Sequence, residues 1–143
     1  MDATKLLTED HNAVRGLFEQ FRAAHESGDS QRMKATQREI FSELETHTRI
    51  EEDIFYPTVR EVGDEDLQEV VAEGIQEHHV VKVLMREIED LSDEEIFAAK
   101  MMVLIENVEH HAEEEENEMF PSVRQHMSDD ELDELGRRLD DAK

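Results

Sequence analysis

The sequence contains an internal repeat, and this repeat limits the possible folds more than any other feature. Residues 47–60 (HTRIEEDIFYPTVR) align without a gap to residues 111–124 (HAEEEENEMFPSVR), with six identical positions: His, Glu, Glu, Pro, Val and Arg. The segments that precede them also match, since Asp10-His11 followed by Val14 corresponds to Glu77-His78 followed by Val81. We therefore expect two copies of one structural unit that pack against each other.

The spacing of apolar residues predicts that each unit is a pair of helices. Five Gly and two Pro among 143 residues leave long uninterrupted stretches in which apolar residues recur at intervals of three and four. Ser92 with Glu95, and Ser128 with Glu131, fit the capping-box pattern that opens a helix. The predicted stretches run from Leu7 to Phe21 with a break at Ser27, from Met33 to Pro57, from Leu67 to Ile88, from Ser92 towards Pro121, and over about 129–141.

Short connections between these helices favour an all-α fold, an antiparallel up-and-down four-helix bundle, because a short loop returns the chain beside its predecessor. Two pseudo-repeated helical hairpins would form the bundle over about residues 3–125, followed by the short C-terminal helix. The length suits one domain covering residues 1–143. Proline cannot donate a backbone hydrogen bond, so we expect Pro57 to end or kink the second helix.

The composition excludes several classes of function. A formal charge of -24 disfavours nucleic acid and anionic membrane surfaces as partners. The absence of Cys excludes disulfides and iron–sulfur clusters, so any metal must be bound through nitrogen and oxygen. No signal peptide or run of about 18 apolar residues is visible, and a cytoplasmic location is expected. The sequence contains no signal for a particular oligomeric state.

Histidine and glutamate residues on the apolar stripes form the candidate site. A separation of four residues places both side chains on one face of a helix, about one turn apart. The second and fourth helices each carry such a His-Glu pair, and the first and third helices each carry one aligned histidine. The candidate residues are His11, His47, Glu51, His78, His111 and Glu115.

A lone histidine facing a core is more often a hydrogen-bonded structural residue than a metal ligand. That explanation must here hold four times, and it must also account for two core-facing carboxylates that would be costly to bury without a cation. Apart from Lys82, no basic residue lies on these stripes. We therefore predict a divalent-metal site, for which imidazole and carboxylate ligands suit Fe, Mn or Zn, with iron as the first choice.

The order H, HxxxE, H, HxxxE, with FYP and MFP near the ends of the second and fourth helices, resembles the hemerythrin HHE cation-binding domain over about residues 5–125. The resemblance implies two Fe ions joined by an oxo or hydroxo bridge. Each iron would take two of the four histidines, and Glu51 and Glu115 would bridge the metals. The small-molecule partners implied are oxygen, hydrogen peroxide or nitric oxide.

One departure from the oxygen-carrying members of this family is Lys82, which stands four residues after His78 where they have another ligating histidine. Another is Glu115, where they usually have Asp. About two of twelve coordination positions would stay open, which favours chemical reaction with oxygen, peroxide or nitric oxide, such as catalase- or peroxidase-like peroxide decomposition, over reversible oxygen carriage. The alternatives are a non-catalytic module that binds or senses oxygen or iron, and a purely structural bundle.

The remaining candidates have weaker support. His79 and His110 lie about 100° around the helix from the site positions, so we predict that they are surface residues. The same is expected of His25 and His126. For Tyr56 we favour packing at a helix end, like Phe120 in the other hairpin, over a hydroxyl directed at the metals.

Overall fold

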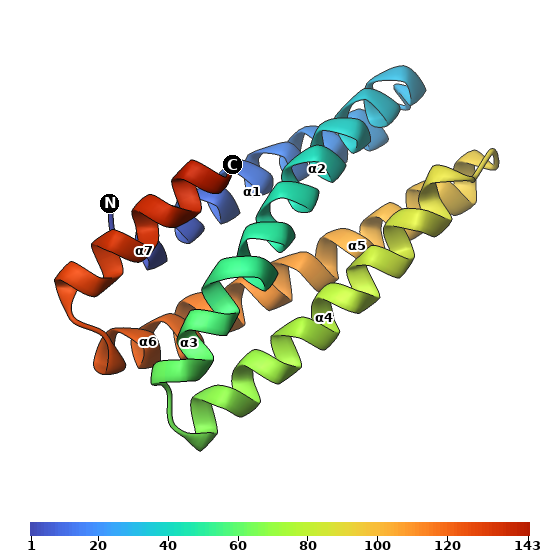
Figure 1. Ribbon diagram of the computed structural model, residues 1–143. Coiled ribbons are helices and arrows are strands. Elements are labelled where there is room, and N and C mark those ends of the chain that lie inside the picture. Colours follow the sequence, from blue (N-terminus) through green and yellow to red (C-terminus); the bar gives the residue numbers. More distant parts are fainter.

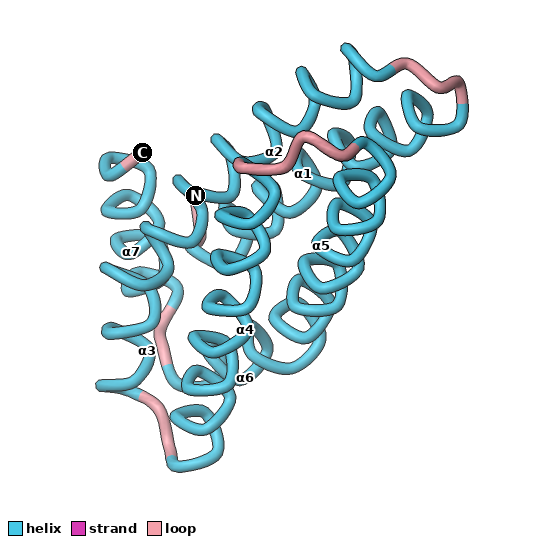
Figure 2. Tube along the Cα trace, turned by 90° about the vertical axis from the view of Figure 1, so that its right-hand side faces the viewer, coloured by secondary structure: helices cyan, strands magenta, loops and turns pink.

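The computed structural model describes residues 1–143 and contains helices but no strands. Four long helical stretches run antiparallel to one another, and both hairpin turns lie at the same end of the molecule (Figures 1 and 2). This arrangement confirms the predicted four-helix bundle with a short C-terminal helix. The stretches are α1 (Ala3–Glu26); α2 (Ser30–Ile50), η1 (Glu51–Phe55) and α3 (Tyr56–Val62); α4 (Glu65–Glu89); and α5 (Glu94–Glu114), η2 (Glu115–Met119) and α6 (Phe120–His126), followed by α7 (Asp129–Ala142).

Side-chain caps define where the helices begin. The predicted capping box at Ser128 and Glu131 is confirmed, with both of its hydrogen bonds present. The one predicted at Ser92 is wrong, because α5 begins at Glu94 and the carboxylate of Asp93 accepts the amide of Ile96. Aspartate is as effective an N-cap as serine, so the helix begins one residue later than expected.

The two prolines do not end their helices, although Pro57 was expected to end or kink the second one. Just before each proline the helix widens for five residues, in η1 and η2, and then continues as α3 or α6. In this wider turn the amide of Tyr56 donates to the carbonyl of Glu51, five residues back, and the amide of Phe120 donates in the same way to Glu115. The prolines fall in the first turn of the following α-helix, where no amide donor is needed.

Two apolar clusters fill the bundle, one on either side of a buried polar layer. One cluster, which includes Val14, Phe18 and Leu104, lies towards the hairpin turns. The other includes Phe55 and Phe120 and is completed by leucines of α7, which packs against α1. A Cβ atom at Gly136 of α7 would lie 1.9 Å from the carbonyl oxygen of Met1, so only glycine permits this close approach. None of the helices has the length and apolar character needed to cross a membrane.

Candidate metal centre

The polar layer between the two apolar clusters consists of the six residues singled out from the sequence. Each is at most 7% exposed. Their potential ligand atoms form two groups of three, within which all the atoms lie within 4.8 Å of one another. We call these groups half A, which is His11, His47 and Glu115, and half B, which is His78, His111 and Glu51.

The Nε2 atoms of all four histidines point into this layer. The Nε2 atom of His11 lies 3.1 Å from Glu115 Oε1, and those of His47 and His78 each lie 3.1 Å from Glu51 Oε1. The Nε2 atoms of His78 and His111 are 3.1 Å apart. Glu51 therefore contacts a histidine of each half.

Glu115 does the same, since its Oε2 atom lies 3.4 Å from His111 Nε2 while its Oε1 atom faces His11. The two carboxylates thus connect half A to half B.

The Nδ1 atoms point outward, and each meets a different carboxylate. The distances are 2.9 Å from His11 to Glu116 and 3.2 Å from His47 to Asp10. In half B, His78 lies 2.9 Å from Glu52 and His111 lies 2.7 Å from Glu77. An ionised carboxylate only accepts hydrogen bonds, so each Nδ1 carries the hydrogen and each Nε2 can present a lone pair to the interior.

These four carboxylates are not among the residues predicted from the sequence. The signal was present, because each carboxylate is adjacent to a candidate residue and each recurs in the repeat: Asp10 with Glu77, and Glu52 with Glu116. Each hydrogen bond crosses to another helical stretch, so its pairing depended on how the helices pack. Such outer carboxylates orient ligating imidazoles and raise their basicity.

The charges of the layer are strongly coupled in the metal-free protein. Burial by itself lowers the pKa of His47, but the charge of Glu51 and the hydrogen bond to Asp10 outweigh it and raise the pKa to about 10. The pKa of His111 is also raised despite burial, chiefly by the charge of Glu115. Burial raises the pKa of Glu115, yet the positive charge of His111 and the hydrogen bond from His11 bring it well below the ordinary value. Without metal, protons therefore balance the buried carboxylates.

Hydrogen bonds leave part of this layer unsatisfied. His47 Nε2 and both carboxylate oxygens of Glu51 are fully buried and make no hydrogen bond of acceptable geometry. Buried polar atoms without partners are rare and costly, and a carboxylate is the costliest of them. A cation between these atoms would satisfy all three, so the donor set fits a metal.

The prediction for Tyr56 is wrong, because its hydroxyl faces the site. The hydroxyl donates to Glu115 Oε2 at 2.6 Å and lies 3.3 Å from the Nε2 atoms of both His78 and His111. In a regular α-helix Tyr56 would lie about 140° from the face that carries Glu51. The wide turn of η1 makes five residues complete about one turn and brings Tyr56 back to that face.

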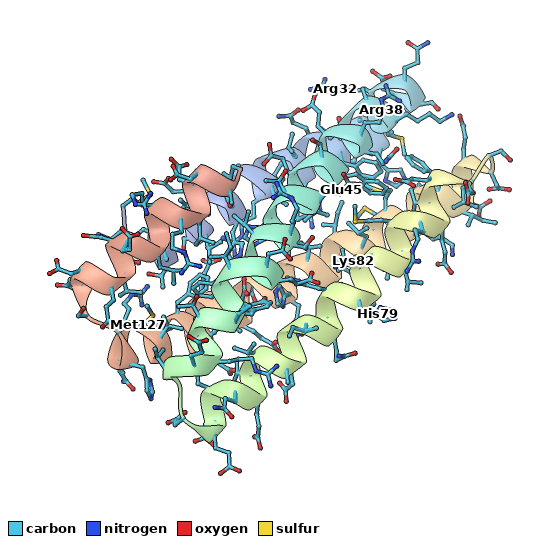
Figure 3. The ribbon with its side chains drawn as sticks, in the orientation of Figure 1. Arg32, Arg38, Glu45, His79, Lys82 and Met127 are labelled. Carbon is cyan, nitrogen blue, oxygen red and sulfur yellow. The ribbon has the colours of Figure 1, made fainter.

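Lys82 was expected on the core stripe, but it lies outside the core. Its side chain is 44% exposed and its Nζ atom lies 2.7 Å from Glu52 Oε2. Figure 3 shows Lys82 on the side of α4 that faces α2 and α3.

His25, His79 and His110 are exposed, as predicted. His126 is partly buried, with its ring 2.8 Å from the carbonyl oxygen of Ser122.

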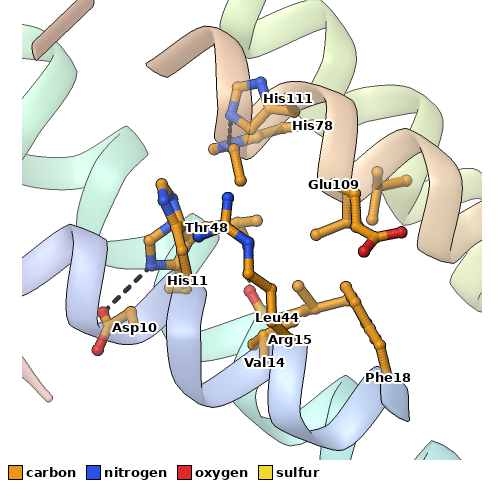
Figure 4. A pocket seen from close by; sticks show the side chains of 14 residues that line it. Asp10, His11, Val14, Arg15, Phe18, Leu44, Thr48, His78, Glu109 and His111 are labelled. Atoms are coloured by element: carbon orange, nitrogen blue, oxygen red, sulfur yellow. Dashed lines mark hydrogen bonds and ion pairs between the residues drawn. The ribbon is translucent and has the colours of Figure 1, made fainter. Parts of the chain in front are cut away.

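A small cavity adjoins the four histidines on the side towards the hairpin turns. Its volume is about 30 Å³, which is room for roughly one or two water-sized molecules. Figure 4 shows the imidazoles of His78 and His111 at one side of this cavity and Phe18 at the opposite side. A cavity of this size and lining suits a small, uncharged molecule.

Comparison with known families decides where this arrangement belongs. Residues 2–123 match the hemerythrin HHE cation binding domain. The chain belongs to this hemerythrin family. The match covers all four bundle helices and therefore every residue of the two halves. The buried His and Glu groups of this hemerythrin domain accordingly form a candidate iron site.

Curated relatives of this hemerythrin chain are distant. It is 27% identical over 145 residues to a DNA nickase of Nostoc sp., covering 100% of this chain and 39% of that protein. It is 23% identical over 124 residues to an uncharacterized hemerythrin-like protein of Schizosaccharomyces pombe (86% of this chain, 60% of that protein). It is 26% identical over 140 residues to an uncharacterized protein of Mycobacterium tuberculosis (97% of this chain, 83% of that protein). No solved structure matches the sequence.

Proposed function

We propose that the protein holds two iron ions, joined by an oxo or hydroxo bridge, and that this centre reacts with oxygen, hydrogen peroxide or nitric oxide and decomposes peroxide. The ligands would be His11, His47, His78, His111, Glu51 and Glu115. One observation carries the proposal: four buried imidazoles turn their Nε2 atoms towards two buried carboxylates, while each Nδ1 is engaged by an outer carboxylate.

The donor set supports iron and a paired centre. Imidazole and carboxylate donors without thiolate suit Fe, with Mn and Zn as competitors. Glu51 lies 3.1 Å from a histidine of each half, which supports a bridging role. Glu115 directs one oxygen towards half A and the other towards half B, which supports the same role.

The residues around the site support reaction with peroxide. Six protein ligands would leave coordination positions open, and the adjoining cavity has room for a molecule the size of hydrogen peroxide. Bound iron would supply a two-electron couple for converting two molecules of peroxide into two of water and one of dioxygen. The hydroxyl of Tyr56, which burial and the charge of Glu115 keep protonated by raising its pKa, is placed to donate a proton or a hydrogen bond to a molecule in half B.

A non-catalytic module that binds or senses oxygen or iron is the second candidate. The matched region makes up 39% of the Nostoc DNA nickase, so in that protein a hemerythrin-like region is combined with further sequence. The formal charge of -24 on the present chain opposes a phosphate backbone, and we propose that neither nucleic acid nor a membrane is a partner.

Iron content and oxygen evolution would test the proposal together. Protein from iron-replete cells should contain two irons per chain, absorb in the near ultraviolet, and release oxygen from added peroxide. A His111→Ala variant should lose iron and this activity. Bound zinc without iron would refute the iron assignment. Two irons with reversible oxygen binding and no peroxide turnover would support the binding module instead.

A further inference from the structure

The repeat extends to two cations outside the candidate ligands. Arg15 follows His11 by four residues, and Lys82 follows His78 by four residues, so they occupy equivalent positions in the two hairpins. Each shares a helix face with its histidine, one turn away. From the sequence, Lys82 is predicted to replace a ligating histidine, but its equivalence with Arg15 indicates a different role.

Each cation binds the carboxylate that orients its own histidine. Arg15 Nη2 lies 2.8 Å from Glu116 Oε2, the same oxygen that accepts the Nδ1 hydrogen of His11 at 2.9 Å. Lys82 Nζ lies 2.7 Å from Glu52 Oε2, which accepts from His78 at 2.9 Å. A single carboxylate oxygen thus joins a cation and an imidazole in both hairpins.

These contacts also connect different helical stretches. Arg15 and His11 belong to α1 while Glu116 belongs to η2, and Lys82 and His78 belong to α4 while Glu52 belongs to η1. Glu52 and Glu116 directly follow Glu51 and Glu115 in the chain. Each cation therefore holds in place the wide turn that carries a buried carboxylate, as well as the imidazole.

Their partial exposure argues against a main role in the stability of the fold. Arg15 is 30% exposed and Lys82 is 44% exposed, and ion pairs at such positions contribute little to folding. What each pair restricts is the rotamer of Glu116 or Glu52. The hydrogen-bond partners of ligating histidines strongly influence metal affinity, so holding these two glutamates in one rotamer should strengthen metal binding.

We propose that Arg15 and Lys82 are positioning residues of the metal centre, which hold Glu116 and Glu52 in place so that the Nε2 atoms of His11 and His78 stay directed at the metals. This inference rests on the proposed metal-binding function. It also implies that Lys82→His removes the ion pair with Glu52 and adds no metal ligand.

The test compares iron release from loaded wild type and variants to an excess of a ferrous chelator after reduction. Arg15→Met and Lys82→Met should release iron faster, by up to about tenfold, near the lower limit for loss of an outer-shell partner. Lys82→Arg should stay near wild type because the positive charge is kept. Arg15→Lys should lie between wild type and Arg15→Met, because it keeps the charge but loses the second contact of Arg15, 3.3 Å to Glu116 Oε1. Lys100→Met is the matched control, since Lys100 forms a 2.9 Å ion pair with Glu87 between α5 and α4, away from the site.

Thermal melting of the metal-free forms separates positioning from folding. Metal-free Arg15→Met and Lys82→Met should melt within about 1–2 °C of metal-free wild type, as expected when surface ion pairs are lost. Iron release from the variants at the wild-type rate would overturn the inference. It would also be overturned if the variants melted well below wild type in the metal-free form, by as much as in the loaded form. A wild-type protein that takes up no iron would instead refute the proposed function.

Discussion

The two halves of the centre differ most at one equivalent pair of residues, Tyr56 and Phe120. In half B the hydroxyl of Tyr56 donates to Glu115 at 2.6 Å and lies 3.3 Å from both histidines. In half A the ring of Phe120 stacks on His11 with an interplanar angle of 8°, and it contributes no polar atom. Both residues are delivered by the same wide helical turn. The same order of helical elements thus produces one half with an extra hydroxyl group and one half that is lined by an aromatic ring.

The largest expected effect is the loss of both halves together when metal is removed. Glu51 and Glu115 each contact both halves, so repulsion and unmet hydrogen bonds would spread through the whole layer. At a free metal concentration about a thousandfold above the dissociation constant, binding would add about 4 kcal/mol to the free energy of unfolding. Chelation should therefore lower the melting temperature by about 10 °C. Calorimetry of loaded and chelated protein measures this change, and equal melting temperatures would contradict a core metal site.

Single histidine substitutions test whether the halves depend on each other. We expect His47→Ala in half A and His78→Ala in half B each to lose iron, because each removes an imidazole that faces Glu51. Metal analysis after gel filtration gives the number of irons per chain. Loss of one iron in each variant would mean that the halves bind independently, and loss of both would mean that the shared carboxylate couples them.

Substitutions at the aromatic pair test what the difference between the halves does for the reaction. Tyr56→Phe removes the hydroxyl and should keep iron bound, yet lower the rate of peroxide decomposition at least about tenfold if this group delivers a proton. Phe120→Tyr is the matched variant, and it should not increase the rate, because Phe120 stacks on His11 and its edge meets Phe55. An unchanged rate in Tyr56→Phe would leave the hydroxyl with a packing role only.

The metal-free protein should respond to pH in both halves at once. The pKa of His47 in half A is raised from 6.5 to about 10, and that of His111 in half B is raised as well. A raised pKa stabilises the fold fully below the unfolded value of 6.5, and this stability is lost as pH rises through about 10. Urea unfolding of metal-free protein at pH 6, 8 and 10 should therefore show falling stability.

Bound iron should weaken this trend, because metal and proton compete for the same Nε2 atoms and metal binding tightens as pH rises. Loaded protein should consequently lose less stability than metal-free protein over the same range. Parallel curves for the two forms would indicate that His47 does not bind metal.

The smallest effect is expected from the neighbouring surface histidines. His79 and His110 lie beside His78 and His111 in the chain, but both are exposed. His79→Ala and His110→Ala should therefore retain iron and change the melting temperature by no more than about 1–2 °C. Loss of iron in these variants, with retention in His78→Ala or His111→Ala, would show that the ligand positions are displaced by one residue.

The helical hairpins and the six candidate residues could be predicted from the sequence alone. Intervals of three and four mark one face of a regular helix, and the HxxxE pairs lie before the wide turns, so the sequence could place His47 with Glu51, and His111 with Glu115, on one buried face. The gapless repeat then paired the hairpins. Local periodicity was sufficient for these features because each is encoded within a single regular helix.

The positions of Tyr56, the four outer carboxylates and Lys82 relative to the site depend on how the helices pack. Tyr56 lies beyond the wide turn of η1, where the regular 100° advance per residue no longer predicts which face a side chain occupies. The contacts of Glu52 and Glu116 could not be predicted from the sequence, because the histidines that they contact are on other helices. Contacts between helices depend on their packing and relative register, and no local pattern within one helix encodes that register.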